Sequence, residues 1–195
     1  MKIEIRRRLL TKPAALCLLL VACRDSGADR AAVPFSELRG ISLGMSRSEV
    51  LSVHPEIFDN SGDLELTLGP HRKAFFVFAH DLPRHPGAPD RLVGVVVSRT
   101  FAPRDTLGLR SSVDSIADFW TRHAGTAVHD PAVELPPRLQ MVYWTLPIGR
   151  IILVSGTDDS PFEPTQEMSV IFQARELSPG ALLPKPSLPG ESGVR

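Results

Sequence analysis

Among the side chains that could do chemistry, the densest group lies in one stretch of the sequence. It contains His80, Asp81, His85 and Asp90, and imidazole nitrogens and carboxylate oxygens are common metal ligands. The same stretch is rich in proline, so we expect an exposed loop over residues 80–90. Two interpretations stay open: a metal or small-ligand site, or a loop whose polar residues simply face water.

Other signatures of catalysis are weak. Residues 158–160 (Asp-Asp-Ser) offer oxygen atoms, but a calcium ion needs roughly six to eight of them from a defined loop. Ser98, Ser111 and Ser155 have no neighbour in the sequence that would mark a nucleophile. Motifs for a nucleophile elbow, a phosphate loop, a dinucleotide site and a helical zinc pair are missing from the sequence. We therefore expect no enzymatic activity, no cofactor and no metal, with an envelope enzyme as the alternative.

Cys23 is the second candidate for chemistry, because of the residues in front of it. Five basic residues at the start of the sequence lead into the apolar residues 14–22, a run shorter than the roughly 20 residues of a membrane-spanning helix. This layout is typical of a secretory signal. The segment Leu20-Val21-Ala22-Cys23 resembles the lipobox of bacterial lipoproteins, in which the thiol is acylated and the signal is cut before the cysteine.

The resemblance implies that residues 1–22 are a signal peptide and that Cys23 is the lipid attachment site, with palmitate as an acyl group. Several acyl chains hold a protein at a membrane much more firmly than one chain does. Arg24 follows the cysteine where an aspartate would resemble an inner-membrane retention signal, so we expect the outer membrane, facing the periplasm. Soluble export after cleavage near Ala22 and an uncleaved anchor are the alternatives.

Composition fits this placement. Cys17 lies inside the expected signal, so an acylated Cys23 leaves no free thiol in the mature chain. Five of 22 basic and one of 22 acidic residues precede Cys23, which leaves 17 against 21 and a formal charge of −4. A weakly acidic chain without a basic stripe argues against nucleic acid as a partner.

The expected mature chain has irregular ends and an ordered middle that begins near Phe35. Residues 23–34 carry charges, serine, glycine and alanine without hydrophobic periodicity, which predicts a flexible tether. The tail, residues 178–195, is rich in proline and is expected to be disordered. Between them, a capping box formed by Ser46 and Glu49 predicts the start of a short helix.

Strand patterns follow that helix at residues 64–68, 73–79 and 91–99, the first two joined by a turn at Gly69-Pro70. A similar order then repeats. Residues 107–112 echo residues 43–48, and Ser111 is expected to cap a longer amphipathic helix that ends at Gly125. Further strand patterns cover residues 139–146, 150–155 and 168–174.

We interpret this order as an internal duplication, with chance similarity of two ordinary α+β segments as the alternative. The sequence thus predicts an α+β fold of two tandem units, residues 35–105 and 106–177. Each unit is expected to contain a helix plus a three-stranded antiparallel sheet, with the helices packed on one face of the sheet.

A family resemblance rests on the first repeat. Leu43-Gly44-Met45-Ser46, feeding a helix with Glu49-Val50 behind a lipobox, is similar to the SmpA/OmlA family of outer-membrane lipoproteins that accompany the β-barrel assembly machinery. Two such units in tandem resemble the β-lactamase inhibitor protein family, whose sheet grips a partner protein on its concave face. The chain departs from the short family at His54-Pro55, where that family has Gly-x-Pro, and in having about twice its length.

The resemblance implies a non-catalytic accessory role that depends on contacts with an envelope protein, in the vicinity of outer-membrane protein assembly. Tyr143 and Trp144 are candidates for that contact. Adjacent strand residues point to opposite faces, so only one of the two can be a core residue. The other is expected to anchor a partner, because exposed tyrosine and tryptophan are enriched in binding hot spots, or else to pack beneath a loop.

Overall fold

The computed structural model describes residues 30–60, 62–82, 88–129, 135, 139–158, 165–178 and 181–182. Contacts divide the chain into two units, Met1–Arg30 and Ala31–Arg195, and the helices and strands of the described residues all belong to the second unit. Within the described residues, neither α-helix is both long enough and apolar enough to cross a lipid bilayer.

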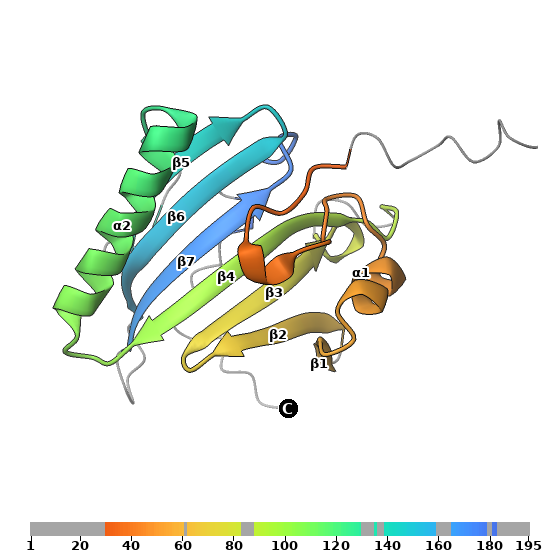
Figure 1. Cartoon of the computed structure of the whole chain (residues 1–195), viewed down its shortest axis with the longest axis horizontal. Coiled ribbons are helices and arrows are strands. Elements are labelled where there is room, and N and C mark those ends of the chain that lie inside the picture. Colours follow the sequence, from red (N-terminus) through yellow and green to blue (C-terminus); the bar gives the residue numbers. More distant parts are fainter. Residues whose placement is uncertain are drawn as a thin grey trace, which may run out of the picture. The chain divides into compact units, whose positions relative to one another are not determined.

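Seven strands of the described chain form one antiparallel sheet (Figure 1). Their order across the sheet is β1-β2-β3-β4-β7-β6-β5, so β4 and β7 join the two halves of the sequence at its centre. The strands are β1 (Phe58–Asn60), β2 (Asp63–Gly69), β3 (Arg72–Phe78), β4 (Leu92–Phe101), β5 (Leu139–Leu146), β6 (Gly149–Asp158) and β7 (Thr165–Gln173).

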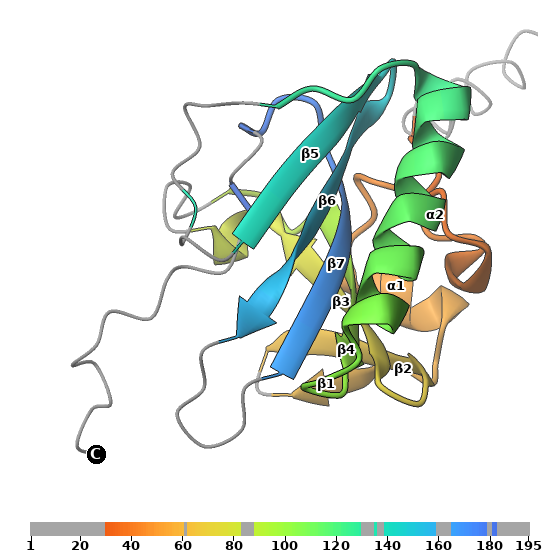
Figure 2. The same cartoon turned by 90° about the vertical axis from the view of Figure 1, so that its left-hand side faces the viewer.

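Two α-helices and a short 3-10 helix lie on one side of this sheet (Figure 2). They are η1 (Ser36–Leu38), α1 (Arg47–Val53) and α2 (Thr106–Ala124), and a second 3-10 helix, η2 (Ala79–Asp81), follows β3. The capping box predicted at α1 is confirmed. The Ser46 hydroxyl accepts from the backbone N–H of Glu49 at 3.3 Å, and the Glu49 carboxylate accepts from the backbone N–H of Ser46 at 2.7 Å.

The register of the strands explains where the core lies. One row of directly opposed residues crosses six strands on the helix-covered face, and all of its side chains are buried: Leu64, Phe76, Val95, Phe172, Ile151 and Trp144. Burial of each such side chain contributes roughly 1.5–3 kcal/mol. Because strand side chains alternate, the neighbouring positions face the other side, where Met141, Ile152, Val154 and Ile171 form a smaller cluster.

The smaller cluster is covered by segments that leave the sheet. Leu135 precedes β5, Leu182 follows β7, and both pack against it. Leu182 lies over Gly94 of β4, where an added Cβ would collide with the leucine Cδ1 atom. A side chain at position 94 would therefore displace Leu182 from the sheet.

The predicted fold class, two tandem helix plus three-stranded units, is wrong. The six strand patterns do correspond to β2 to β7, but they form a single seven-stranded sheet that also contains the unpredicted β1. β4 pairs with β7 from Gly94 and Gln173 to Phe101 and Gln166, so the halves share one sheet and one core. Local patterns locate strands, whereas the pairing of distant strands depends on which faces can be buried together.

The predicted start of the second helix is also wrong. Its N-cap is Asp105, whose carboxylate accepts from the backbone N–H of Gly108 at 2.9 Å. Residues 107–112 are therefore helical, whereas the similar residues 43–48 mostly precede α1. Ser111 lies inside α2 because the helix already begins at the earlier aspartate, which accepts from one of the free N–H groups of the first turn.

An isolated antiparallel bridge, between Ala32 and Ser42, already forms before Phe35. The backbone N–H of Val33 donates to the carbonyl of Ile41 at 3.0 Å, and that of Leu43 donates to Ala31 at 2.9 Å. The Val33 side chain is buried in the main core. The last residues of the predicted tether thus pair with the segment that leads into α1.

Candidate functional site

A groove on the helix-covered face is the candidate site. It has a volume of about 560 Å³, within the range of roughly 300–1,000 Å³ that is usual for ligand sites. Its floor is apolar and comes from the central strands, with Val97 on β4 and Met168 and Val170 on β7, all buried. These three side chains belong to the main core, and they also form the apolar bottom of the groove.

The two walls come from distant parts of the sequence. One wall is the segment at η1, with Pro34, Phe35, Ser36 and Glu37. The other is α2, whose lining residues lie on one side of the helix at spacings of three and four: Ser111, Ser112, Ser115, Ile116, Phe119 and Trp120. η1 and α2 lie over the same face of the sheet, on either side of the groove floor (Figure 1).

An ion pair connects the first wall to the sheet. Arg72 Nη1 of β3 donates to Glu37 Oε1 at 2.5 Å, and the Ser36 hydroxyl donates to Glu37 Oε2 at 2.9 Å. Partial burial alone would raise the pKa of Glu37, but hydrogen bonds from its own backbone, Ser36 and Arg72 together lower that pKa below its ordinary value. Glu37 is thus a carboxylate at neutral pH.

A second arginine lines the same end of the groove. Arg99 of β4 is the cross-strand partner of Arg72. Its guanidinium lies 4.8 Å from the centre of the Phe101 ring. Among the described residues, Arg99 has no carboxylate partner. This end of the groove therefore carries two guanidinium groups and one carboxylate.

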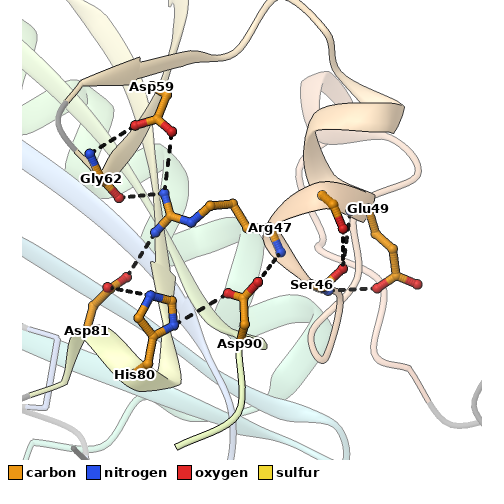
Figure 3. Close-up of polar contacts among 9 residues, drawn as sticks. Ser46, Arg47, Glu49, Asp59, Gly62, His80, Asp81 and Asp90 are labelled. Carbon is orange, nitrogen blue, oxygen red and sulfur yellow. Dashed lines mark hydrogen bonds and ion pairs between the residues drawn. The ribbon is translucent and has the colours of Figure 1, made fainter. Parts of the chain in front are cut away.

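The other conspicuous arginine, Arg47 at the start of α1, is fully engaged (Figure 3). Its Nη1 donates to the carbonyl of Gly62 at 2.6 Å, and its Nη2 lies 3.5 Å from Asp81 Oδ2. Asp59 lies 4.0 Å from Nη1, and the guanidinium lies 4.7 Å from the centre of the Phe78 ring. These contacts fasten α1 to β1, β3 and η2.

The predicted metal or small-ligand loop is part of this Arg47 cluster. His80 Nε2 lies 2.9 Å from Asp81 Oδ1, and His80 Nδ1 lies 3.4 Å from Asp90 Oδ1 (Figure 3). Asp90 also accepts from the backbone N–H of Arg47 at 3.2 Å. Within the described chain, no group of three or more histidine, cysteine or acidic side chains could hold a metal ion. His85 lies outside the described residues.

Several other predicted positions also lie outside the described residues, namely the lipid attachment site Cys23 and residues 159–160. Of the serines considered as nucleophiles, Ser111 lines the groove, Ser98 pairs with the hydroxyl of Ser169 at 2.8 Å, and Ser155 lies in β6. Among the described residues, none of these three hydroxyls hydrogen-bonds directly to a histidine or a carboxylate, and Ser98 reaches the Glu167 carboxylate only through Ser169.

The two aromatic residues proposed as a partner contact point to opposite faces. Trp144 is fully buried in the main core, and its indole N–H has no hydrogen-bond partner among the described groups. Tyr143 is half-buried on the other face, where it packs against the smaller cluster together with Leu135 and Leu139. Trp144 is therefore the core residue of the pair, and a partner contact by Tyr143 remains a prediction.

Sequence reasoning did not find the groove, although one signal for it was present. Arg99 has the same strand parity as the buried Val95 and Val97, and Arg72 has that of Ala74 and Phe76. A charge at a core-facing strand position indicates that something other than packing is required there. The wall at η1 leaves no comparable signal in the sequence, because the position of η1 depends on the pairing of Val33 with Ile41.

No family model matches the chain, and neither a known protein nor a solved structure matches it. The similarity to the SmpA/OmlA family remains a prediction from the motif at residues 43–50.

Proposed function

We propose that this chain is a lipid-anchored cell-envelope protein that acts without catalysis, by holding a segment of a partner protein in the groove between η1 and α2. The observation that carries the proposal is the groove itself. Its floor is apolar, and its walls belong to elements that only the folded sheet brings together. Buried apolar surface with a polar rim is the usual anatomy of a protein-binding site.

The groove favours binding over catalysis. The lining hydroxyls belong to Ser36 on one wall and to Ser111, Ser112 and Ser115 on the other. Ser36 donates to Glu37, and Glu37 is in turn paired with Arg72. A serine nucleophile needs a general base within hydrogen-bond reach, and the described lining residues offer the three α2 serines none.

Membrane attachment is the other half of the proposal, and it rests on the sequence around Cys23. The variant Cys23→Ser should no longer incorporate labelled palmitate and should leave the membrane fraction, because the thiol that carries the acyl chains is missing. Equal labelling and equal sedimentation of the variant and the native chain would rule out a lipid anchor at this residue.

The binding half can be tested by photo-cross-linking in intact cells. A benzophenone amino acid replaces Phe119, a half-exposed residue on the rim of the groove, or Ile148, an exposed residue in the β5–β6 turn that does not line it. The Phe119 position should give a discrete protein adduct that the Ile148 position does not give. A second change, Ser115→Trp, fills the groove from α2 and should abolish the adduct.

Thermal unfolding of Ser115→Trp provides the folding control, since residue 115 is exposed and should tolerate the change. Identical adducts from positions 119 and 148, or an adduct that persists when residue 115 is tryptophan, would contradict the use of the groove.

A further inference from the structure

The charges at one end of the groove point to the class of segment that it holds. Arg72 and Arg99 stand directly opposite each other on neighbouring strands, on the face that lines the groove. Like charges in this arrangement are destabilising. Glu37 offsets one of them by pairing with Arg72, and within the described chain no carboxylate offsets the other.

The guanidinium of Arg99 is available for a ligand. It lies over the ring of Phe101 at 4.8 Å, and among the described residues it has no carboxylate partner. Arg99 is exposed and lines the groove. A guanidinium presents paired N–H donors that match the two oxygens of a carboxylate.

Hydroxyl groups on the opposite wall add further donors. The side chains of Ser111, Ser112 and Ser115 line the groove from α2. None of these three hydroxyls has a hydrogen-bond partner among the described residues. A row of free hydroxyls across from an unpaired arginine can complete the coordination of a carboxylate, which accepts several hydrogen bonds.

The remaining lining is apolar. Val97, Met168 and Val170 form the floor, and the rings of Phe35 and Phe119 stand on opposite walls. From these features we infer that the bound segment carries an aspartate or glutamate flanked by large apolar side chains, with its carboxylate on Arg99. This inference rests on the proposed function, that the groove holds a protein segment.

The expected mature chain has a formal charge of −4, so its overall field does not attract an acidic segment. The preference for an acidic segment must therefore come from local contact with Arg99. A segment with lysine or arginine at the same place would meet the uncompensated charge of Arg99, and is rejected.

The test is selection of short random peptides on the purified full chain in detergent, followed by affinity measurement of the selected peptides. The selected sequences should share an acidic residue between large apolar residues. Replacing that acid by its amide in the peptide, or making Arg99→Gln in the chain, should each weaken binding about tenfold or more. The two changes together should weaken binding little further than either alone.

Arg110→Gln is the matched control. It removes the same charge from α2 beside the groove, but Arg110 does not line it and its side chain is 83% exposed. Its affinity for the selected peptides should equal that of the native chain.

The outcomes separate this inference from the proposed function. Selected peptides without a shared acidic residue, or equal losses from Arg99→Gln and Arg110→Gln, would overturn the inference. The proposed function survives that result if Ser115→Trp still abolishes peptide binding. Selection of no peptide that depends on the groove would overturn both.

Discussion

Two arginines with opposite surroundings organise the polar chemistry of this fold. Arg47 at the start of α1 is surrounded by Asp59, Asp81 and Asp90, and it donates to a backbone carbonyl while lying against the ring of Phe78. Arg99 on β4 faces another arginine and, among the described residues, has an aromatic ring as its contact and no acid.

The different surroundings of the two arginines indicate different roles, Arg47 in holding the fold together and Arg99 in binding a ligand. The Arg47 side chain is only 20% exposed, and its partners lie on β1, β3 and the segment around η2, so it joins α1 to the sheet. Arg99 is exposed, joins nothing by an ion pair in the described chain, and lines the groove. A half-buried cation with satisfied partners stabilises a fold, whereas an unpaired cation on an apolar surface is available to a ligand.

The largest expected effect is on the Arg47 cluster. Arg47→Met keeps the apolar stem but removes the hydrogen bond to Gly62 and the positive charge beside Asp59 and Asp81. The free energy of unfolding should fall by about 2–3 kcal/mol, as measured by chemical denaturation. Arg110→Met, at an exposed i,i+4 pair with Asp114, should change it by less than about 0.5 kcal/mol. Equal losses of unfolding free energy in Arg47→Met and Arg110→Met would show that Arg47 has no special structural role.

A smaller loss is expected at the N-cap beside the same cluster. Ser46→Ala removes the hydroxyl that accepts from Glu49, although the backbone contact of Arg47 with Asp90 remains. The expected loss is about 1 kcal/mol. Ser46→Asp restores a capping acceptor and should recover most of it, and failure to recover would show that the cap is not the cause.

In the groove, Glu37 should contribute less to the free energy of unfolding than the Arg47 cluster does, and its contribution should depend on pH. Its pKa is lowered in the folded chain, so its stabilising effect is present above the ordinary value of 4.5 and disappears as the pH falls through the folded-state pKa. Glu37→Gln should cost less than about 1 kcal/mol at pH 7. In denaturation at a series of pH values, the difference from the native chain should vanish in acid, and a difference that grows in acid would have the wrong sign.

The smallest effect on stability is expected at Arg99. Arg99→Gln removes a charge that repels Arg72 and that has no acidic partner in the described chain. The free energy of unfolding should change by no more than about 0.5 kcal/mol in either direction, and a gain is compatible with relief of repulsion. A loss as large as that of Arg47→Met would show that Arg99 has a structural role.

The sequence predicts the elements of this fold better than their assembly. The capping box at Ser46 and the strand patterns are local, and the structure contains them. The partnership of β4 with β7 is not local, because it joins residues such as Val97 and Val170 that are distant in the sequence. The echo between residues 43–48 and 107–112 was misleading, since Asp105 caps α2 earlier.

The candidate site was harder to predict than the fold. Arg72 and Arg99 break the apolar parity of β3 and β4, and that signal is visible in the sequence once the strands are aligned. Glu37 and Phe119 come from elements whose contact with the groove depends on three-dimensional packing. The pair Tyr143 and Trp144 was correctly assigned to opposite faces by alternation alone, but alternation does not tell which residue is covered.

The most direct test measures how much a selected acidic peptide raises the free energy of unfolding, at one fixed peptide concentration, in the native chain and in Arg47→Met and Arg99→Met. We predict that Arg47→Met lowers the starting free energy of unfolding but keeps the native increment. Arg99→Met should keep the starting stability and lose about 1.4 kcal/mol of the increment, which corresponds to a tenfold weaker affinity. An increment that is unchanged in Arg99→Met, or one that is lost equally in both variants, would contradict the division of roles between the two arginines.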